Sequence, residues 1–145
     1  MAIIPKKNYF TDAEMKCKCG CGITWMNSRL RITANIIREA FGHAIIVNSG
    51  FRCLLHNQAV GGVTKSPSRL ILRGAAGGPN DSNHTHGTAM DMSTSYGTPK
   101  QLHALALKLY KEGELIYLAG LGLYSWGIHI DVDPWTKGVL RQWNG

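Results

Sequence analysis

Two histidines and an aspartate lie within eight residues of one another in the stretch SNHTHGTAMDM, from Ser82 to Met92. Imidazole nitrogens and carboxylate oxygens are common zinc ligands in proteins. A tight turn at Gly87 would bring His84 and Asp91 to one site. The stretch therefore indicates a metal site, with ordinary turn residues as the alternative, because His, Asn, Thr and Asp are common in turns.

A second polar group occurs near the end of the chain, in GIHIDVD. Strand alternation places His129, Asp131 and Asp133 on one face and the apolar residues on the other. A polar row on a buried strand needs a partner. Two histidines and one carboxylate, drawn from both stretches, would leave a fourth zinc position open for water, as catalytic zinc requires. Exposed strand and loop residues are again the alternative.

Composition limits the classes of protein that these residues can belong to. The 145 residues, 44% of them hydrophobic, suffice for one core, and we expect one domain over 1–145. The net charge of +7 favours an anionic partner, which could be nucleic acid, an acidic membrane face or a bacterial wall, and charge alone does not choose among them. The basic residues are scattered and not interleaved with aromatic ones, so we do not expect nucleic-acid binding.

Periodicity predicts the elements that must position the candidate ligands. Apolar residues recur every three or four positions over 27–41 and 98–113, which predicts two amphipathic helices. A capping box at Thr11 predicts a short helix near the N-terminus. Apolar, β-branched runs predict a buried strand over 44–50 and two strands within 114–134. Those last strands are too close for a helical crossover, so part of the sheet must be antiparallel and the class is α+β.

Three of the four cysteines, Cys17, Cys19 and Cys21, lie in the segment CKCGCG, and the fourth is Cys53. The spacing lacks the CxxC pair of common zinc fingers. We consider a structural zinc clip, or a disulfide that ties the N-terminal segment to Cys53. Free thiols in a reducing compartment are the alternative.

A loop rich in Gly, Ser and Pro extends from Gly61 to Asn83 and carries Lys65, Arg69 and Arg73 at its tip. A loop of that length in a small domain is usually functional or disordered. The N-terminal residues MAIIPKKNYF show neither a secretory signal nor a membrane span. We therefore expect synthesis in the cytoplasm without a signal peptide, and no integral membrane segment.

The segment SNHTHGTAMD matches every fixed position of the SxHxxGxAxD motif, and so resembles the LAS zinc metallopeptidases. These are the zinc D-Ala-D-Ala carboxypeptidases and L-alanyl-D-glutamate endopeptidases. SGFRCLLHNQAVGG is similar to their SGYR segment, and GLGLYSWGIHIDVDP is similar to their closing strand. NYFTDAEMKCKCGCG resembles the N-terminus of small phage-type members. The resemblance covers nearly the whole chain and implies a mainly antiparallel sheet flanked by helices, as in Hedgehog and D-Ala-D-Ala peptidase domains.

The resemblance also implies roles for individual residues. His84, Asp91 and His129 fall on the ligands of one catalytic zinc ion. Arg52 falls on the basic residue that holds the peptide and polarises the scissile carbonyl, which suits its planar guanidinium. Ser82 falls on a position that lines the substrate groove.

The chain departs from the family pattern at Trp126. Several branches carry an acidic general base at this place, three residues before the last histidine. We predict that Asp131 is the base, because it follows His129 by two residues on the same strand face. A carboxylate that only supports the ligand, and His86 as the base, are the alternatives.

The function implied by the resemblance is hydrolysis of a peptide bond in peptidoglycan stem peptides. The protein would be a monomeric phage endolysin, released to the host periplasm or wall by a membrane-permeabilising partner. The alternative is a non-catalytic, zinc-containing wall-binding module on the same scaffold, as the Hedgehog signalling domain suggests.

Overall fold

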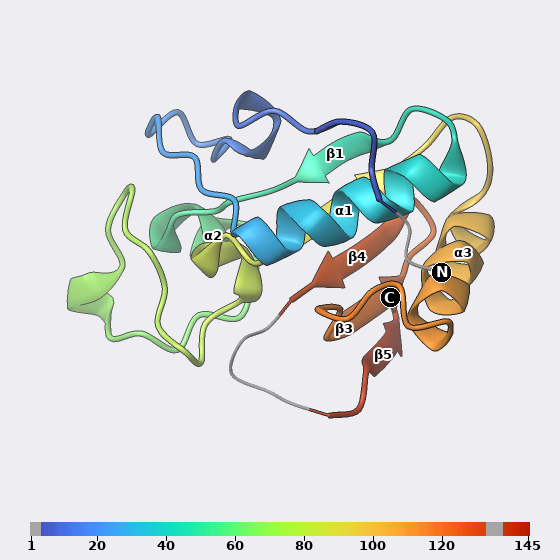
Figure 1. Ribbon diagram of the computed structural model, residues 1–145. Coiled ribbons are helices and arrows are strands. Elements are labelled where there is room, and N and C mark those ends of the chain that lie inside the picture. The colour runs from blue at the N-terminus through green and yellow to red at the C-terminus, as the bar shows by residue number, and fades with distance from the viewer. Residues whose placement is uncertain (1–3, 133–137) are drawn as a thin grey trace.

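The computed structural model describes residues 4–132 and 138–145 (Figure 1). Three α-helices in this part of the chain are α1 (Ser28–Phe41), α2 (Leu54–Ala59) and α3 (Pro99–Lys111). The strands are β1 (Ile46–Ser49), β2 (Ala89–Ser93), β3 (Gly120–Leu123), β4 (Ile128–Asp131) and β5 (Arg141–Asn144). Short 3-10 helices are η1 (Ala13–Met15), η2 (Ser68–Leu70) and η3 (Asn83–His86). Nowhere in the described ranges is a helix long and apolar enough to cross a membrane.

The strands form one sheet in the order β1-β2-β4-β3-β5. β3 and β5 pair in parallel, whereas the other neighbouring pairs are antiparallel. This confirms the predicted α+β class with a mainly antiparallel sheet.

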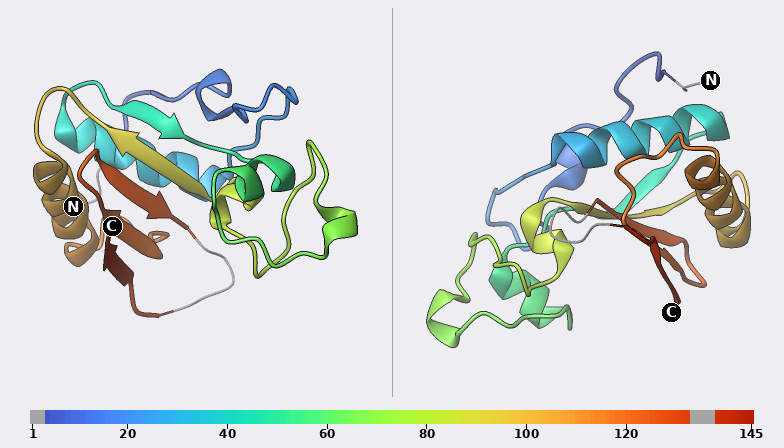
Figure 2. Two further views of the ribbon diagram at one scale, coloured as in Figure 1. Left: turned by 180° about the vertical axis from the view of Figure 1, so that it is seen from behind. Right: turned by 60° about the horizontal axis from the view of Figure 1, so that its bottom comes forward.

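Helices α1 and α3 cover one face of the sheet, as the tilted view in the right panel of Figure 2 shows. Leu30 and Ile37 of α1 and Leu102 and Leu109 of α3 are buried in the main core. From the strands the core takes Met90, Met92, Leu121, Ile128 and Ile130. Because strand side chains alternate, the residues between these point to the opposite face of the sheet. That face carries the candidate ligands.

The ends of the two long helices follow the sequence signals. The Asn27 side chain caps α1 by accepting a 2.8 Å hydrogen bond from the Arg29 N–H, and Gly42 ends the helix at a φ of 80°. Thr98 and Gln101 form a capping box at the start of α3. The predicted helices over 27–41 and 98–113 are thus confirmed. The capping box at Thr11 also forms, but only the single turn η1 follows it.

One strand prediction needs correction, and one strand was missed. The segment 44–50 contains β1, but this strand is at the edge of the sheet, and Ile46 is 53% exposed instead of buried. The sequence analysis missed β5, because its four residues RQWN have neither an apolar run nor a turn signal. The two strands predicted within 114–134 are β3 and β4, while Asp133 and Pro134 lie outside the described residues.

The loop from Gly61 to Asn83 is organised around a buried carboxylate, Asp81. Its oxygens accept hydrogen bonds from the backbone N–H groups of Lys65, Ser66 and Gly78 and from the Ser66 hydroxyl at 2.6 Å. Burial acts to raise the pKa of Asp81, but these hydrogen bonds outweigh it and lower the pKa to about 2. One acidic side chain therefore holds together segments of the loop that are far apart in sequence.

Candidate metal centre

The three predicted ligands meet on the sheet face away from the helices. His84 lies in η3, Asp91 in β2 and His129 in β4. One Asp91 oxygen is 3.3 Å from His84 Nε2, and the other is 2.9 Å from His129 Nδ1. One donor atom from each residue lies within 4.8 Å of the other two. A His₂Asp donor set fits a zinc ion with one open coordination position.

Local backbone structure explains why these residues converge. The Ser82 hydroxyl caps η3 by accepting a 3.3 Å hydrogen bond from the His84 N–H. Gly87 then turns the chain into β2 with a φ of 68°, a conformation that favours glycine. The antiparallel register places Asp91 directly opposite His129. Sheet register and one tight turn thus fix the whole donor set.

The far side of each imidazole is held by the protein. His84 Nδ1 is 2.8 Å from the carbonyl oxygen of Gly50. His129 Nε2 is 2.8 Å from Asp131 Oδ2, and Arg141 donates to the other Asp131 oxygen. Such contacts fix the tautomer and orientation of a histidine that binds metal through its other nitrogen.

Hydrogen bonds and nearby charge keep Asp91 ionised despite its burial. Burial acts to raise its pKa, but hydrogen bonds with His129 and His84 outweigh burial and hold the pKa well below the usual range. Burial lowers the pKa of His84. For His129 burial also acts to lower the pKa, but the hydrogen bonds with Asp131 and Asp91 raise it overall. The centre therefore presents a permanent carboxylate between two imidazoles, which suits a divalent cation.

Arg52 places a positive charge beside the centre. Its Nη2 is 3.4 Å from Asp91 Oδ2, while Nε donates to the Ser49 hydroxyl at 3.1 Å and Nη1 to the Asn57 side chain at 3.2 Å. Asn57 is fully buried and donates to Val63 and Thr64, so it is itself fixed. The guanidinium is thus held in place before any ligand binds.

The centre lies in a cleft of about 570 Å³. Arg52 and Ser82 line it together with the three ligands. Both ends of the 61–83 loop reach its rim. The aromatic residues that line it are Tyr124, Trp126 and Trp143. The cleft therefore combines polar and charged groups of both signs with aromatic side chains.

The comparison with known families bears on this arrangement. Residues 8–69 match the Peptidase M15 family model. This is a LAS-type zinc peptidase family, so the resemblance seen in the sequence is confirmed. The matched part includes Arg52 but ends before His84, and the two later ligands also lie beyond it. A search of the curated proteins found no match.

The three residues considered in relation to the general base differ in their surroundings. Trp126, three residues before His129, lines the cleft and is 43% exposed. Asp131 is 1% exposed and contacts the His129 nitrogen that faces away from Asp91. His86 is buried, with Nε2 against the carbonyl oxygen of Gly78. Asp131 lines the cleft, whereas His86 does not.

Arg141 and Trp143 are residues of the site that the sequence analysis missed. Both lie in β5, and the parallel register with β3 places Arg141 beside Gly120 and Trp143 beside Gly122. A Cβ at Gly120 would overlap the Asp131 carboxylate, and one at Gly122 would overlap the Trp143 indole. Glycines inside a strand often mark such close approaches. The glycines of the run GLGL were therefore the feature of the sequence from which these close approaches could have been predicted.

Proposed function

We propose that this protein is a zinc-dependent peptidase that hydrolyses a peptide bond in peptidoglycan stem peptides. The observation that carries the proposal is the convergence of His84, Asp91 and His129 in an open cleft beside the fixed Arg52 guanidinium. The Peptidase M15 match supports a metallopeptidase. The peptidoglycan substrate rests on the resemblance to the LAS peptidases. The further proposal, a phage endolysin that acts on the host wall as a monomer, rests on the same resemblance.

The donor set assigns the metal and its chemistry. His84 Nε2, His129 Nδ1 and an oxygen of Asp91 would hold zinc, which when bound lowers the pKa of a bound water to about 7 and stabilises negative charge. The surrounding residues then have separate tasks. Arg52 would bind the scissile carbonyl oxygen and stabilise the oxyanion, because its guanidinium is fixed next to Asp91.

Asp131 has a supporting task in this proposal. The Asp131 carboxylate accepts from His129 Nε2–H, which leaves Nδ1 with its lone pair directed at the Asp91 side. Arg141 compensates the Asp131 charge from the side opposite His129. The geometry thus favours Asp131 as a positioning residue over the general base predicted from the sequence.

The remaining cleft residues suit an anionic peptide. Arg52 and Arg141 supply cationic groups, and Tyr124, Trp126 and Trp143 supply aromatic surface. Stem peptides carry free carboxylates, which the planar guanidinium group binds with two parallel hydrogen bonds. The net charge of +7 adds a long-range attraction to an acidic wall.

Digestion of purified cell walls tests the proposal. We expect new amino groups to be released and mass spectrometry of the fragments to identify one cleaved stem-peptide bond. The His84→Ala variant should release none. The second candidate is a non-catalytic wall-binding module, which the presence of Trp126 in place of the family acid favours. A protein that sediments with walls without releasing amino groups would support that candidate instead.

A further inference from the structure

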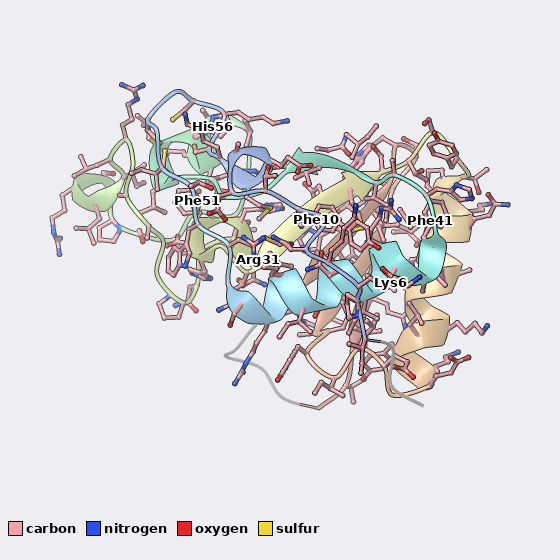
Figure 3. The ribbon with its side chains drawn as sticks, turned by 45° about the horizontal axis from the view of Figure 1, so that its top comes forward. Lys6, Phe10, Arg31, Phe41, Phe51 and His56 are labelled. Carbon is pink, nitrogen blue, oxygen red and sulfur yellow. The ribbon has the colours of Figure 1, made fainter. Side chains whose placement is uncertain are left out.

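The four cysteines meet at a second place, away from the catalytic centre. Cys17, Cys19 and Cys21 come from the N-terminal segment, and Cys53 directly precedes α2. Their four sulfur atoms lie within 4.8 Å of one another, and none forms a disulfide. They pack with Phe51 in a small cluster separate from the main core. Figure 3 shows Phe51 well apart from Phe10, which belongs to that core.

Two distances between the sulfur atoms match those of a tetrahedral metal site. Cys17 Sγ is 3.5 Å from Cys19 Sγ, which is 3.7 Å from Cys53 Sγ. Four sulfurs bound to zinc at about 2.3 Å are separated by about 3.8 Å, whereas the sulfurs of a disulfide are about 2.05 Å apart. Four thiolates leave no position for water, so such a site is structural and not catalytic.

The backbone around the cysteines is shaped for this convergence but has few other restraints. Gly20 and Gly22 alternate with the cysteines and have φ values of 87° and 84°, which let the chain wrap around one point. Residues 16–27 contain no helix or strand. A 2.9 Å hydrogen bond from the Cys17 N–H to the Ile23 carbonyl closes the loop. A metal ion would supply the folding energy that a satellite cluster of this size lacks.

Cationic side chains near the cluster can offset the negative charge of a four-thiolate zinc site. Four thiolates and one zinc ion carry a net charge of −2, which the neighbouring Lys16 and Lys18 can offset. Arg73 is a third cation, with Nη2 3.3 Å from the place of a Cβ at Gly20.

The segment held by the cluster leads into the catalytic centre. Cys53 follows Arg52 in the chain, and the Phe51 N–H donates to the Met15 carbonyl at 2.8 Å. The Gly50 carbonyl contacts His84 Nδ1 at 2.8 Å, and the Arg52 N–H donates to the His84 carbonyl at 3.0 Å. Residues 50–53 therefore connect the cysteine cluster to one zinc ligand and to the arginine beside it.

We infer that Cys17, Cys19, Cys21 and Cys53 bind a structural zinc ion, and that this zinc clip holds residues 50–53 in place against His84. The zinc clip itself is independent of the peptidase proposal. Its effect on the catalytic centre rests on the proposed function. The two parts are therefore tested by separate measurements.

Metal analysis tests the clip. Wild-type protein loaded with Zn²⁺ is expected to hold two equivalents, Cys21→Ser one, and His84→Ala one. Cys21→His, which keeps a zinc-binding side chain, should retain two and is the matched control. Protein that has been unfolded and stripped of metal, without any reducing agent, should show four free thiols. The clip would be overturned if wild-type protein held only one zinc equivalent and Cys21→Ser still held it. Fewer than four free thiols in the wild type would also overturn it.

Cobalt substitution identifies which centre a metal occupies, whether or not the protein is a peptidase. A thiolate-to-Co²⁺ charge-transfer band should be present in His84→Ala and absent in Cys21→Ser. Hydrogen exchange then tests the effect on the catalytic centre. Exchange at the amides of Phe51 and Arg52, both hydrogen-bonded, should be at least tenfold faster in Cys21→Ser, with α3 unchanged. Equal exchange rates at these amides would overturn the holding role.

Discussion

Asp131 lies behind His129, with its Oδ2 2.8 Å from Nε2, whereas Asp91 contacts the opposite ring nitrogen, Nδ1, at 2.9 Å. The His129 imidazole therefore joins the Asp91 carboxylate on one side of the ring to the Asp131 carboxylate on the other. A carboxylate in this outer position raises the basicity of the histidine and fixes its orientation. Asp131 is therefore poorly placed to take a proton from a water on the Nδ1 side of the ring.

Changing Asp131 to Asn separates the two roles. We expect zinc affinity to fall about 10- to 100-fold, because the His129 tautomer and orientation are no longer fixed. Hydrolysis should then recover substantially when excess zinc is supplied. Competition with a chelator measures the affinity, and stem-peptide hydrolysis measures the recovery.

The opposite pattern would restore the sequence-based prediction for Asp131. A general base contributes typically 10²- to 10⁴-fold to the rate without affecting metal binding. Unchanged zinc affinity together with a rate loss of that size, not rescued by zinc, would identify Asp131 as the base.

Part of the candidate centre could be predicted from local signals, whereas the assignment of His84, Asp91 and His129 as one ligand set came from the resemblance to the LAS peptidases. Gly87 supplies the turn between His84 and Asp91, and strand alternation separates His129 from the apolar residues beside it. The helices also lie close to their predicted bounds, because periodicity and caps act over a few neighbouring residues, as the Asn27 side chain does on the Arg29 N–H. Each of these features depends on residues close together in sequence.

The remaining features depend on contacts between distant segments. Whether β1 is buried depends on its place in the strand order, which its own residues do not encode. The role of Asp131 depends on which His129 nitrogen it faces, and strand alternation gives only the face of the sheet. Arg141 reaches Asp131 only because β5 pairs with β3.

Changing Gly120 to Ala should weaken zinc binding without touching a ligand. The added Cβ would overlap the Asp131 carboxylate and push it away from His129. We expect a loss of zinc affinity in the same direction as for Asp131→Asn, measured by chelator competition. The double variant should be no worse than Asp131→Asn alone, because both changes act through one contact. Additive losses would mean that Gly120→Ala acts elsewhere.

Changing Arg52 to Lys should reduce catalysis and leave zinc in place. Lysine cannot keep the separate hydrogen bonds to Ser49 and Asn57 and also face the substrate. Loss of one oxyanion donor typically costs about 10²- to 10³-fold in kcat, and we expect a fall in that range. Arg69→Lys, in the exposed part of the loop, is the control and should be neutral. An Arg52→Lys variant with normal kcat would exclude Arg52 from oxyanion stabilisation.

The Asp81 carboxylate should make the stability of the protein depend on pH in the acid range. Its pKa is about 2 in the folded protein, against an ordinary value of 3.8. The unfolded chain therefore binds the proton more tightly, so the stabilisation is complete above about pH 4 and is lost as the pH falls towards 2. This pKa shift contributes about 2 kcal/mol to the free energy of unfolding.

Asp81→Asn should accordingly lower the free energy of unfolding by about 2 kcal/mol at pH 7, with a much smaller effect near pH 2. Urea denaturation of both proteins at several pH values measures the difference. Asp12→Asn is the control, because Asp12 is an exposed partner of Arg31 and such pairs contribute at most about 1 kcal/mol. If the Asp81→Asn difference is the same at pH 7 and pH 2, the loss reflects altered packing, and the ionised carboxylate does not hold the loop.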